Sequence, residues 1–303
     1  MLWIDMEVVM TLRKLEIFYC VAEKLNMTTV SKGLHISQPA ISQMIKEMEE
    51  ELGVRLFNRL GKRLYLTDEG ELFKTYSRRM MNLYQEFERV LEEKKDLKTG
   101  KLKLGASSTI GVYLMPQLIK KFIKELPDID ISLKIGNTKD IANMIVKNEI
   151  DFAFVESEVD MDEIKSEEIW NDELLIITHP EHRWGENLEI DESELKSEKF
   201  ILREEGSGTR KIFEAAMKNN HIKYRESFTL GNTEAIKEII MTGLGISCLS
   251  KLTVRKELAE GKLKGYKLKN FEIVRGFNLI HHKDKHLSPL MKEFIRMGKE
   301  RRI

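Results

Sequence analysis

Residues 27–48 read MTTVSKGLHISQPAISQMIKEM and hold two short segments in which apolar side chains recur every three or four residues. This periodicity predicts one helix over about residues 28–34 and another over about residues 38–51. The three residues between them, 35–37, leave room only for a tight turn. Ser37 suits the N-cap of the second helix, and Pro39 falls in its first turn, where a missing N–H does no harm.

Two helices joined by so short a turn are typical of a helix-turn-helix. This motif needs a small residue where the helices cross and a turn residue that tolerates a left-handed backbone. Ser31 and His35 occupy these two positions. An apolar stripe from Leu15 to Leu25 predicts a further helix before the pair.

The face of the second helix that points away from its apolar stripe is polar. Its side chains are donors and acceptors suited to base edges and phosphates in a major groove: Gln38, Ser42, Gln43 and Lys46. An ordinary solvated helix face is the alternative interpretation. The charge of the next stretch of chain favours DNA.

Positive charge is concentrated directly after this helix. Residues 53–66 contain no Asp or Glu and four basic residues, Arg55, Arg59, Lys62 and Arg63. In residues 60–66, LGKRLYL, the side-chain character alternates around a glycine, which is typical of a small hairpin with a glycine turn. The first 66 residues hold nine Lys and Arg against eight Asp and Glu, so the excess is local. The pattern predicts a basic wing that meets the phosphate backbone of DNA.

Residues 68–97 predict one long helix with an apolar seam. Its apolar side chains alternate between spacings of three and four: Phe73, Tyr76, Met80, Leu83, Phe87 and Val90. Such a seam packs either on the chain's own domains or on the same helix of a second subunit, and its place after a DNA-reading module favours pairing. The helix is expected to end at residues 98–100. We therefore expect a DNA-binding domain over 1–67, a linker and dimerisation helix over 68–98, and an effector-binding domain over 99–303.

From Lys101 onward, strand-like and helix-like segments alternate. Strands are expected at residues 102–106, 129–135, 151–155 and 174–178, with helical stretches between them. This alternation is typical of a mostly parallel α/β sheet. It occurs twice, which predicts two α/β lobes with a cleft between them: lobe I over about 101–170 and 268–303, and lobe II over about 171–267.

Hydroxyl and amide side chains follow the expected strands. Ligands of α/β sheets gather beyond the carboxyl ends of strands, where helix N-termini favour anions. Within 206–210, GSGTR, two glycines allow a close approach to a ligand and the arginine can neutralise a carboxylate or oxyanion. Each residue taken singly also fits a simple N-cap. The site for a small anionic effector is expected at Ser107, Ser108, Thr109, Asn137, Thr138, Ser207, Gly208, Thr209, Arg210 and Thr233.

The composition excludes several other classes of protein. The 303 residues are 42% hydrophobic and 33% charged with a net charge of zero, which fits about two soluble domains and requires any polyanion site to be local. We expect a cytoplasmic protein with no membrane contact, because the chain has no transmembrane stretch and no signal peptide. Either Met1 or Met10 can be the start. No motif for a catalytic residue, a metal or a cofactor occurs, and Cys20 and Cys248 are expected to be reduced core thiols.

The segment over residues 15–70 resembles the LysR-type transcriptional regulators. The matching residues are Phe18, Leu34, 36–42 (ISQPAIS), Ile45, Glu49, 52–57 (LGVRLF), Arg59 and 66–70 (LTDEG). The chain length, the long helix and the two-lobed remainder are also similar to this family. Departures are Val30 and Ser31, where most members have two alanines, and Gly33, where they have another residue. Residues 203–210 look like the branch that regulates sulfur and cysteine metabolism and carbon fixation.

The resemblance implies a winged helix-turn-helix, a dimerising linker helix and a periplasmic-binding-protein-like effector domain. It further implies a homotetramer on an interrupted inverted repeat of double-stranded DNA, with a metabolite between the lobes that changes the subunit arrangement and the DNA bend. It places the DNA contacts at Thr28, Ser37, Gln38, Pro39, Ser42 and Gln43, with Arg63 in the wing. It places the effector at Ser107, Ser108, Thr109, Thr138, Ser207 and Thr209.

The expected function is therefore a ligand-responsive transcriptional regulator that acts as a dimer or tetramer. A solute-binding protein that uses only the two-lobed half is the alternative, although the first 97 residues and the lack of a signal peptide count against it. An α/β enzyme would need a nucleophile, base or cofactor motif that the sequence lacks. The identity of the effector, the target genes, and the choice between activation and repression stay open.

Overall fold

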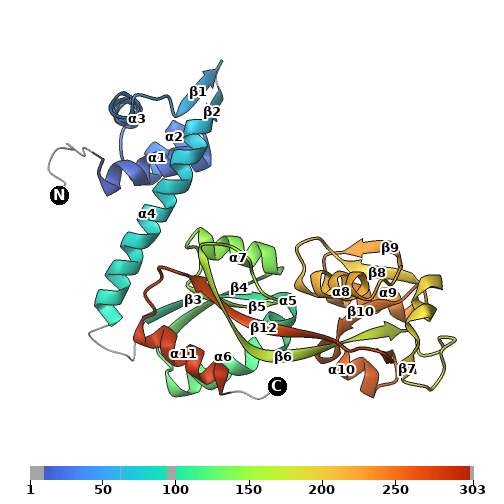
Figure 1. Cartoon of the computed structure of the whole chain (residues 1–303). Helices are drawn as coiled ribbons and strands as arrows, with labels where there is room; N and C mark the ends of the chain where they lie inside the picture. Colours follow the sequence, from blue (N-terminus) through green and yellow to red (C-terminus); the bar gives the residue numbers. More distant parts are fainter. Residues whose placement is uncertain (1–9, 62, 94–99, 301–303) are drawn as a thin grey trace. The chain divides into compact units, whose positions relative to one another are not determined.

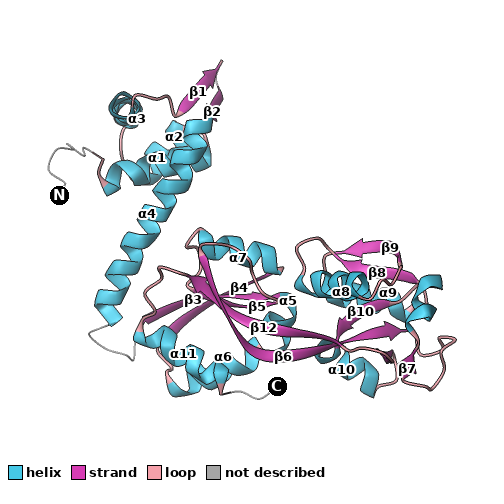
Figure 2. Cartoon of the chain, viewed as in Figure 1, coloured by secondary structure: helices cyan, strands magenta, loops and turns pink. Residues whose placement is uncertain are grey.

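The computed structural model of the chain describes residues 10–61, 63–93 and 100–300, the side chains of 89–93 excepted. Lys62, the leader 1–9 and the expected boundary residues 98 and 99 lie outside the described residues. The chain divides near residue 91 into two compact units, an N-terminal unit and a larger α/β unit. Figure 1 traces both along the sequence, and Figure 2 shows that helix dominates the first unit.

The N-terminal unit begins with three helices: α1 (Leu12–Lys24), α2 (Met27–Leu34) and α3 (Gln38–Leu52). The hydroxyl of Ser37 accepts the N–H of Ala40, so the expected N-cap is confirmed. His35 follows α2 with a left-handed backbone, φ 55°, which confirms the expected turn. Apolar side chains of all three helices share one core that includes Phe18, Val30 and Ile41. These contacts define a helix-turn-helix.

The expected wing is a two-stranded antiparallel hairpin of β1 (Phe57–Leu60) and β2 (Arg63–Leu66). Gly61 at its tip has φ 63°, a conformation that glycine adopts without strain. The carboxylate of Glu49 accepts the backbone N–H groups of Leu56 and Phe57 at 2.8 and 3.0 Å. The side chain of α3 thereby holds the start of the wing against the helix-turn-helix.

Helix α4 (Asp68–Glu93) follows the wing, and its first turn lies in close contact with the backbone of the chain before the wing. The hydroxyl of Thr67 donates to the carbonyl of Arg55 and accepts the N–H of Gly70. A Cβ atom at Gly70 would lie 2.1 Å from the carbonyl oxygen of Leu56, so this position has room only for glycine. The first turn of α4 is therefore tied to the chain that enters the wing.

Most of the apolar seam of α4 is exposed within the single chain. Phe73 packs on Phe18 with ring centroids 4.7 Å apart, so the first seam residue belongs to the core of the unit. Farther along, Tyr76, Leu83 and Phe87 are 51%, 63% and 57% exposed. The side chain of Val90 lies outside the described residues. An exposed apolar stripe of this length is a surface that a second molecule can cover.

The α/β unit contains lobe I, then lobe II, then a return to lobe I. Lobe I begins with β3 (Gly100–Ser107), α5 (Ser108–Tyr113), α6 (Met115–Glu125), β4 (Ile129–Gly136), α7 (Thr138–Val146) and β5 (Phe152–Glu156). The long strand β6 (Ile164–Thr178) leads to β7 (Glu189–Ile190), a 3-10 helix (Glu192–Ser197), β8 (Lys199–Arg203), α8 (Gly208–Asn219), β9 (Arg225–Leu230), α9 (Thr233–Met241), β10 (Ser247–Ser250), α10 (Lys251–Ala259) and β11 (Lys264–Leu268). The long strand β12 (Ile273–His282) and α11 (Pro289–Lys299) complete the unit.

The expectation of a mostly parallel sheet is wrong. The main sheet has the order β4-β3-β5-β12-β6-β11-β7, with β10 paired to β6, while β8 and β9 pair separately. Strand β12 is antiparallel to both β5 and β6, and β10 and β11 are antiparallel to β6. The cause is the path of the chain, because it leaves lobe I along β6 and returns along β12 in the opposite direction. The fold is a mixed α/β fold of two lobes.

Each lobe has apolar cores on both faces of its strands. In lobe I, α6 and α11 cover one face, with Phe122 and Phe294 in the core, and α7 covers the other with Ile141. In lobe II, α8 contributes Phe213 to one core and α9 contributes Ile236 to another. Along β6, Trp170 packs in the core of lobe I and Leu174 in that of lobe II. The two long strands therefore connect two separately packed lobes.

Replacing Gly70 by Ala should destabilise the N-terminal unit by roughly 1–3 kcal/mol, because the added methyl group overlaps the backbone of Leu56. Gly33→Ala is the matched control, since a Cβ there meets no atom within 4 Å in α2. Alanine at that helical position should be neutral or stabilise by up to about 1 kcal/mol. Hydrogen exchange of α1 amides in the full-length protein measures both effects. Equal protection in the two variants would contradict the assigned role of Gly70.

Candidate functional sites

The polar face of α3 is open to solvent as expected. Ser37, Pro39, Gln43 and Lys46 are exposed, and Gln38 and Ser42 are half-buried. Gln43 donates to Glu47 at 3.1 Å, and Lys46 pairs with Glu50 at 3.4 Å, both along the same helix. Pairs of this exposed kind contribute little to stability and exchange readily for other partners. The face can therefore present donors and acceptors to a groove.

A hollow of about 340 Å³ lies between the helix-turn-helix and the wing. It brings together Thr28 of α2, Gln38 of α3, and Arg59 and Arg63 of the wing. Among its described lining residues, the two arginines carry positive charge and none carries a carboxylate. Arg55 is exposed but does not line the hollow, and Lys62 lies outside the described residues. The hollow is thus a local positive surface in a chain of zero net charge.

Asn26 also lines this hollow, although the sequence pattern did not single it out. Its side chain accepts the N–H of Thr29 and caps α2. The cap fixes the first turn of α2, on which Thr28 lies. An amide directly before an expected helix was the available signal, since such residues are common N-caps.

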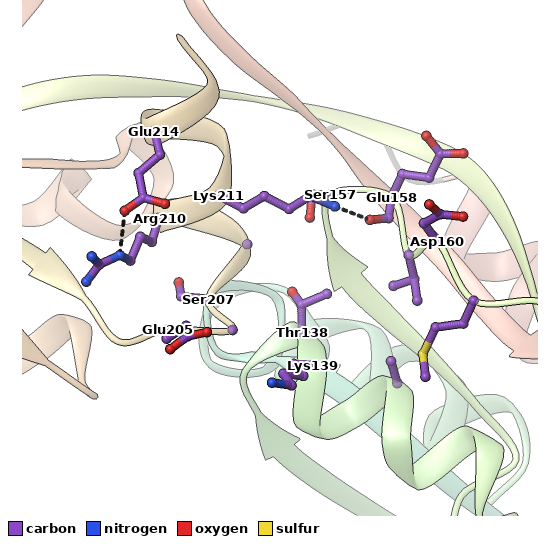
Figure 3. A pocket seen from close by; sticks show the side chains of 15 residues that line it. Thr138, Lys139, Ser157, Glu158, Asp160, Glu205, Ser207, Arg210, Lys211 and Glu214 are labelled. Atoms are coloured by element: carbon purple, nitrogen blue, oxygen red, sulfur yellow. Dashed lines mark hydrogen bonds and ion pairs between the residues drawn. The ribbon is translucent and has the colours of Figure 1, made fainter. Parts of the chain in front are cut away.

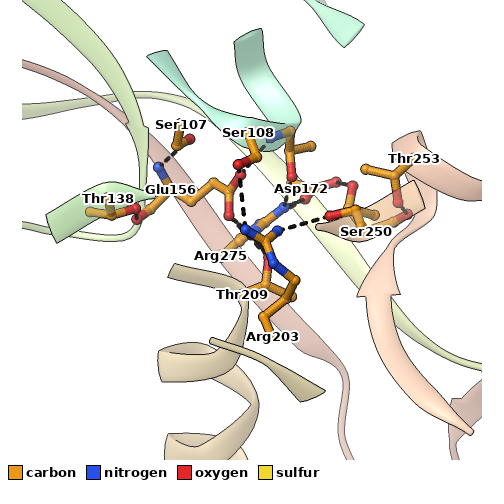
Figure 4. Close-up of polar contacts among 12 residues, drawn as sticks. Ser107, Ser108, Thr138, Glu156, Asp172, Arg203, Thr209, Ser250, Thr253 and Arg275 are labelled. Atoms are coloured by element: carbon orange, nitrogen blue, oxygen red, sulfur yellow. Dashed lines mark hydrogen bonds and ion pairs between the residues drawn. The ribbon is translucent and has the colours of Figure 1, made fainter. Parts of the chain in front are cut away.

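Four residues of the expected effector site make hydrogen bonds to Glu156 at the end of β5 (Figure 4): Ser107, Thr109, Thr138 and Thr209. The backbone N–H of Thr109 donates to Oε1 at 2.9 Å, and the hydroxyl of Thr209 donates to Oε2 at 3.0 Å. The main chain of Glu156 donates to Ser107 Oγ at 3.1 Å and accepts from Thr138 Oγ1 at 2.9 Å. Both lobes contribute, because Thr109 belongs to α5 and Thr209 to α8.

Arg275 of β12 completes this network. Its Nη1 lies 2.7 Å from both Glu156 Oε2 and Thr209 Oγ1. Its Nε donates to Asp172 of β6 at 2.8 Å. The hydroxyl of Ser250 donates to the same carboxylate at 2.9 Å. Glu156 and Arg275 are only 2% and 3% exposed, so this is a buried ionic cluster in which one guanidinium pairs with two carboxylates.

The two carboxylates differ in their proton affinity. Burial by itself raises the pKa of Glu156, but the Arg275 charge and the hydrogen bonds from Thr109 outweigh it and lower this pKa to about 2. Burial also raises the pKa of Asp172, and there it outweighs Arg275. Glu156 is therefore the carboxylate that its surroundings hold most firmly in the charged form.

The two arginines near α8 have different surroundings. Arg203 is buried, and its guanidinium donates to Thr233 Oγ1 at 2.8 Å and to Ser108 Oγ at 3.4 Å. Arg203 also pairs with Glu204 at 2.7 Å, whereas Arg210 pairs with Glu214 at 2.7 Å and Glu226 at 2.9 Å. The structure thus brings Ser108 and Thr233 to Arg203 rather than to Arg210.

A cavity of about 440 Å³ opens beside Glu156, between α7 of lobe I and the N-terminus of α8 (Figure 3). Of the residues expected at the effector site, Thr138, Ser207, Gly208 and Arg210 line it, and Ser157 lines it as well. In the part of the chain that the structure describes, the hydroxyls of Ser157 and Ser207 are buried and have no hydrogen-bond partner. The lining charges are mixed: Lys139, Arg210 and Lys211 against Glu158, Asp160, Glu205 and Glu214. The volume is in the range of small-molecule sites.

Glycine lets the two lobes meet closely at this cavity. A Cβ atom on Gly208 would lie 2.4 Å from the carbonyl oxygen of Glu156. The N–H of Lys139 donates to the carbonyl of Gly206 at 3.3 Å. Asn137 caps α7 by accepting the N–H of Asp140, so its side chain has a structural role here.

A second polar contact joins the lobes through Tyr113 of α5. Lys237 of α9 is buried and pairs with Glu234 and Glu257, each at 2.7 Å. Its ammonium also donates to the hydroxyl of Tyr113 at 3.2 Å, and this hydroxyl is bonded to Glu234. Burial, together with the bond to Glu234, raises the pKa of Tyr113 to about 12 against the opposing effect of Lys237. Tyr113 and Lys237 therefore add a polar contact between the lobes that is separate from the Glu156 cluster.

The sequence pattern missed Glu156, Asp172, Arg203 and Arg275. Charged residues inside strands that are otherwise apolar, FAFVE over 152–156 and IVRGFNLI over 273–280, were the available signal. Such residues are rarely buried without a partner. The pairing itself connects positions 119 residues apart.

The described residues contain no group of three or more His, Cys, Asp and Glu that could hold a metal ion. None of the helices in these ranges is long and apolar enough to span a membrane. Cys20 and Cys248 are free thiols, and burial raises the pKa of Cys248 to about 12.

Comparison with known proteins gives two family matches. Residues 12–71 match "Bacterial regulatory helix-turn-helix protein, lysR family", and residues 95–302 match "LysR substrate binding domain". The uncharacterized HTH-type transcriptional regulator YeiE of Escherichia coli (strain K12) is 35% identical over 94% of this chain and 96% of its own. The HTH-type transcriptional regulator CysL of Bacillus subtilis (strain 168) is 30% identical over 92% and 91%.

Solved structures show the same architecture. Full-length CbnR in complex with its target DNA is similar with a TM-score of 0.71 at 21% identity, over 95% of this chain and 98% of CbnR. The regulatory domain of CcmR from Synechocystis PCC6803, in complex with 2-PG, has a TM-score of 0.61 at 30% identity and covers 66% of this chain and 95% of its own. With both halves matched in this order, the chain belongs to the LysR family of transcriptional regulators.

Proposed function

We propose that this LysR-family regulator binds an interrupted inverted repeat in promoter DNA as a homo-oligomer and responds to a small anionic metabolite. The observation that carries the proposal is the hollow in which Thr28, Gln38, Arg59 and Arg63 meet beside the exposed face of α3. Helix termini and arginines on one surface suit a duplex, with side chains for base edges and guanidinium groups for phosphates.

The DNA contacts that we propose follow from this surface. Gln38, Ser42 and Gln43 would contact base edges in the major groove, because they lie on the polar side of α3, where Gln43 is exposed and the other two are half-buried. Contacts to phosphates that position the domain would come from Thr28, Ser37, Lys46, Arg55, Lys62 and Arg63. Pro39 has no N–H to donate and would contact the DNA only through its ring. We assign DNA binding to residues 1–67.

Self-association would use α4 within a linker segment over residues 68–98. The exposed apolar side chains of Tyr76, Leu83 and Phe87 support this role, because a second copy of the stripe would bury them. Pairing α4 with its copy would also present two helix-turn-helix units to the two halves of an inverted repeat.

The effector would bind between lobe I, over about 101–170 and 268–303, and lobe II, over about 171–267. Three helix N-termini lie at this position: those of α5, α7 and α8. They favour an anion even though the lining charges of the cavity are mixed. The unpartnered hydroxyls of Ser157 and Ser207 supply hydrogen bonds for it. Among the similar structures, the CcmR regulatory domain holds 2-PG and the effector domain of QuiR holds shikimate.

Substitutions on the DNA surface should separate recognition of bases from attraction to phosphates. Gln38→Ala or Ser42→Ala should reduce specificity by roughly 1–3 kcal/mol for each lost base contact. Arg63→Ala should weaken specific and scrambled DNA alike and lower the salt slope by about 1. Electrophoretic mobility titrations on the intergenic DNA upstream of the gene measure these effects.

Lys121→Ala on the exposed side of α6 is the control for a lost surface charge. It should leave both affinities unchanged. No preference of the unaltered protein for the upstream DNA over scrambled duplex at physiological salt would refute the proposed function. Equal effects of Gln38→Ala and Arg63→Ala on both duplexes would refute the assigned roles.

A charge on the seam of α4 should dissociate the oligomer. Leu83→Glu is expected to weaken self-association by at least tenfold, because a carboxylate would be buried in an apolar interface. Gln85→Glu adds the same charge to another exposed position of the helix and should have little effect. Sedimentation equilibrium of the full-length protein gives the association constants. A monomeric unaltered protein, or equal constants for the two variants, would exclude this use of α4.

Removal of single hydroxyls from the interlobe site should weaken effector binding. Ser207→Ala and Thr109→Ala each remove about 0.5–1.5 kcal/mol of hydrogen bonding. The measurement is isothermal titration with an effector found in a panel of small carboxylates and oxyanions. Ser227→Ala on the exposed strand β9 is the control. A tight neutral ligand, or unchanged affinity in the two site variants, would contradict the site.

A further inference from the structure

We infer that Glu156 is a built-in ligand of the interlobe site, and that a small oxyanion effector binds there by displacing its carboxylate. The inference extends the proposed response to an effector. Only its consequence for regulation rests on the proposed function. The presence of an anion-binding site that is filled by the chain's own carboxylate follows from the contacts alone.

The groups around this carboxylate are those that recognise a free oxyanion. One oxygen accepts the backbone N–H of Thr109 in the first turn of α5, and the other accepts the hydroxyl of Thr209 in the first turn of α8. Arg275 donates to the second oxygen at 2.7 Å. Backbone N–H groups at helix N-termini, hydroxyls and a guanidinium form the usual set of partners for a carboxylate or a similar oxyanion.

These partners come from elements of both lobes. Thr109 lies on α5 of lobe I, Thr209 on α8 of lobe II, and Arg275 on the strand β12 that connects the lobes. The glycine at position 208 lets α8 approach the main chain of Glu156 closely enough for this contact. The carboxylate therefore acts as a bridge that holds the lobes in their present arrangement.

An effector anion cannot simply be added beside Glu156. Arg275 already contacts two carboxylates, those of Glu156 and Asp172. A third negative charge at the same buried position would be repelled strongly, because like charges in a poorly solvated site cannot all stay ionised. Exchange avoids this cost, since one anion leaves as the other arrives.

The neighbouring cavity gives room for the exchange. Its lining includes Ser157, the residue after Glu156, and Ser207, the residue before Gly208. The hydroxyls of these two serines are buried and have no partner among the described residues. Each can donate a hydrogen bond to an incoming oxyanion or to the displaced carboxylate.

Displacement predicts that Glu156 competes with the effector. Removing its side chain should empty the anion site, loosen the contact between the lobes, and let small free anions bind in its place. Asp172 offers a matched comparison, because its buried carboxylate contacts Arg275 and Ser250 but neither Thr109 nor Thr209 in any bond that the structure records.

The test uses full-length Glu156→Ala, Asp172→Ala and the unaltered protein, without DNA. Each is titrated with formate, acetate and sulfate, and chloride is used to match ionic strength. Thermal unfolding and isothermal titration are the readouts. Glu156→Ala should bind at least one oxyanion at least tenfold more tightly than the other two proteins and should regain thermal stability on binding. Tightest binding of formate or acetate would identify a carboxylate effector, and tightest binding of sulfate a tetrahedral oxyanion.

The inference is overturned if Glu156→Ala binds these anions no better than Asp172→Ala does. Should Glu156→Ala fail to fold, Glu156→Gln keeps the shape and removes the charge, and it must still show at least a tenfold gain in oxyanion affinity over the unaltered protein. The double variant Glu156→Ala/Thr209→Val should lose the gain, because an anion at this site needs the hydroxyl of α8. DNA binding is measured separately, so failure of the proposed function and failure of this inference give different results.

Discussion

The arrangement of the two lobes depends on the buried guanidinium of Arg275. A buried charge is tolerated only when it is paired and hydrogen-bonded, so its partners must stay within contact distance. Those partners are Glu156, Asp172, Thr209 and Thr109, which lie on β5, β6, α8 and α5. One side chain thereby sets the positions of two strands and of two helix N-termini from opposite lobes. Anything that changes this pairing changes how the lobes meet.

In the N-terminal unit, contacts to the main chain have the same role. Glu49 accepts two backbone N–H groups at the start of the wing, and Gly70 lets α4 touch the carbonyl of Leu56. The wing arginines therefore stand beside α3 because of contacts made by residues that do not face the hollow. Both units position their candidate site residues through buried or close-packed partners, since exposed ion pairs contribute little to stability.

Local features were predictable from the sequence where neighbouring residues decide the conformation. The turn at His35, the cap at Ser37 and the glycine tip of the wing were all found in this way. Strand β6 was expected only over 174–178 but begins at Ile164, because its first half is rich in charged residues and lacks a continuous apolar run. The mixed direction of the sheet was missed because strand pairing depends on the path of the whole chain.

In the candidate site, too, some features depend on neighbouring residues and others on the path of the whole chain. Hydroxyl residues after strands follow from local pattern, since the carboxyl ends of strands and the N-termini of helices meet there. The partner of these hydroxyls does not follow from local pattern, because Glu156 and Arg275 are 119 residues apart. They become neighbours only when β5 and β12 pair. Residue type and spacing therefore establish the helix-turn-helix, the wing and the family. Which charges are buried, and which carboxylate lies between the lobes, is decided by folding, because electrostatic pairing acts through space rather than along the chain.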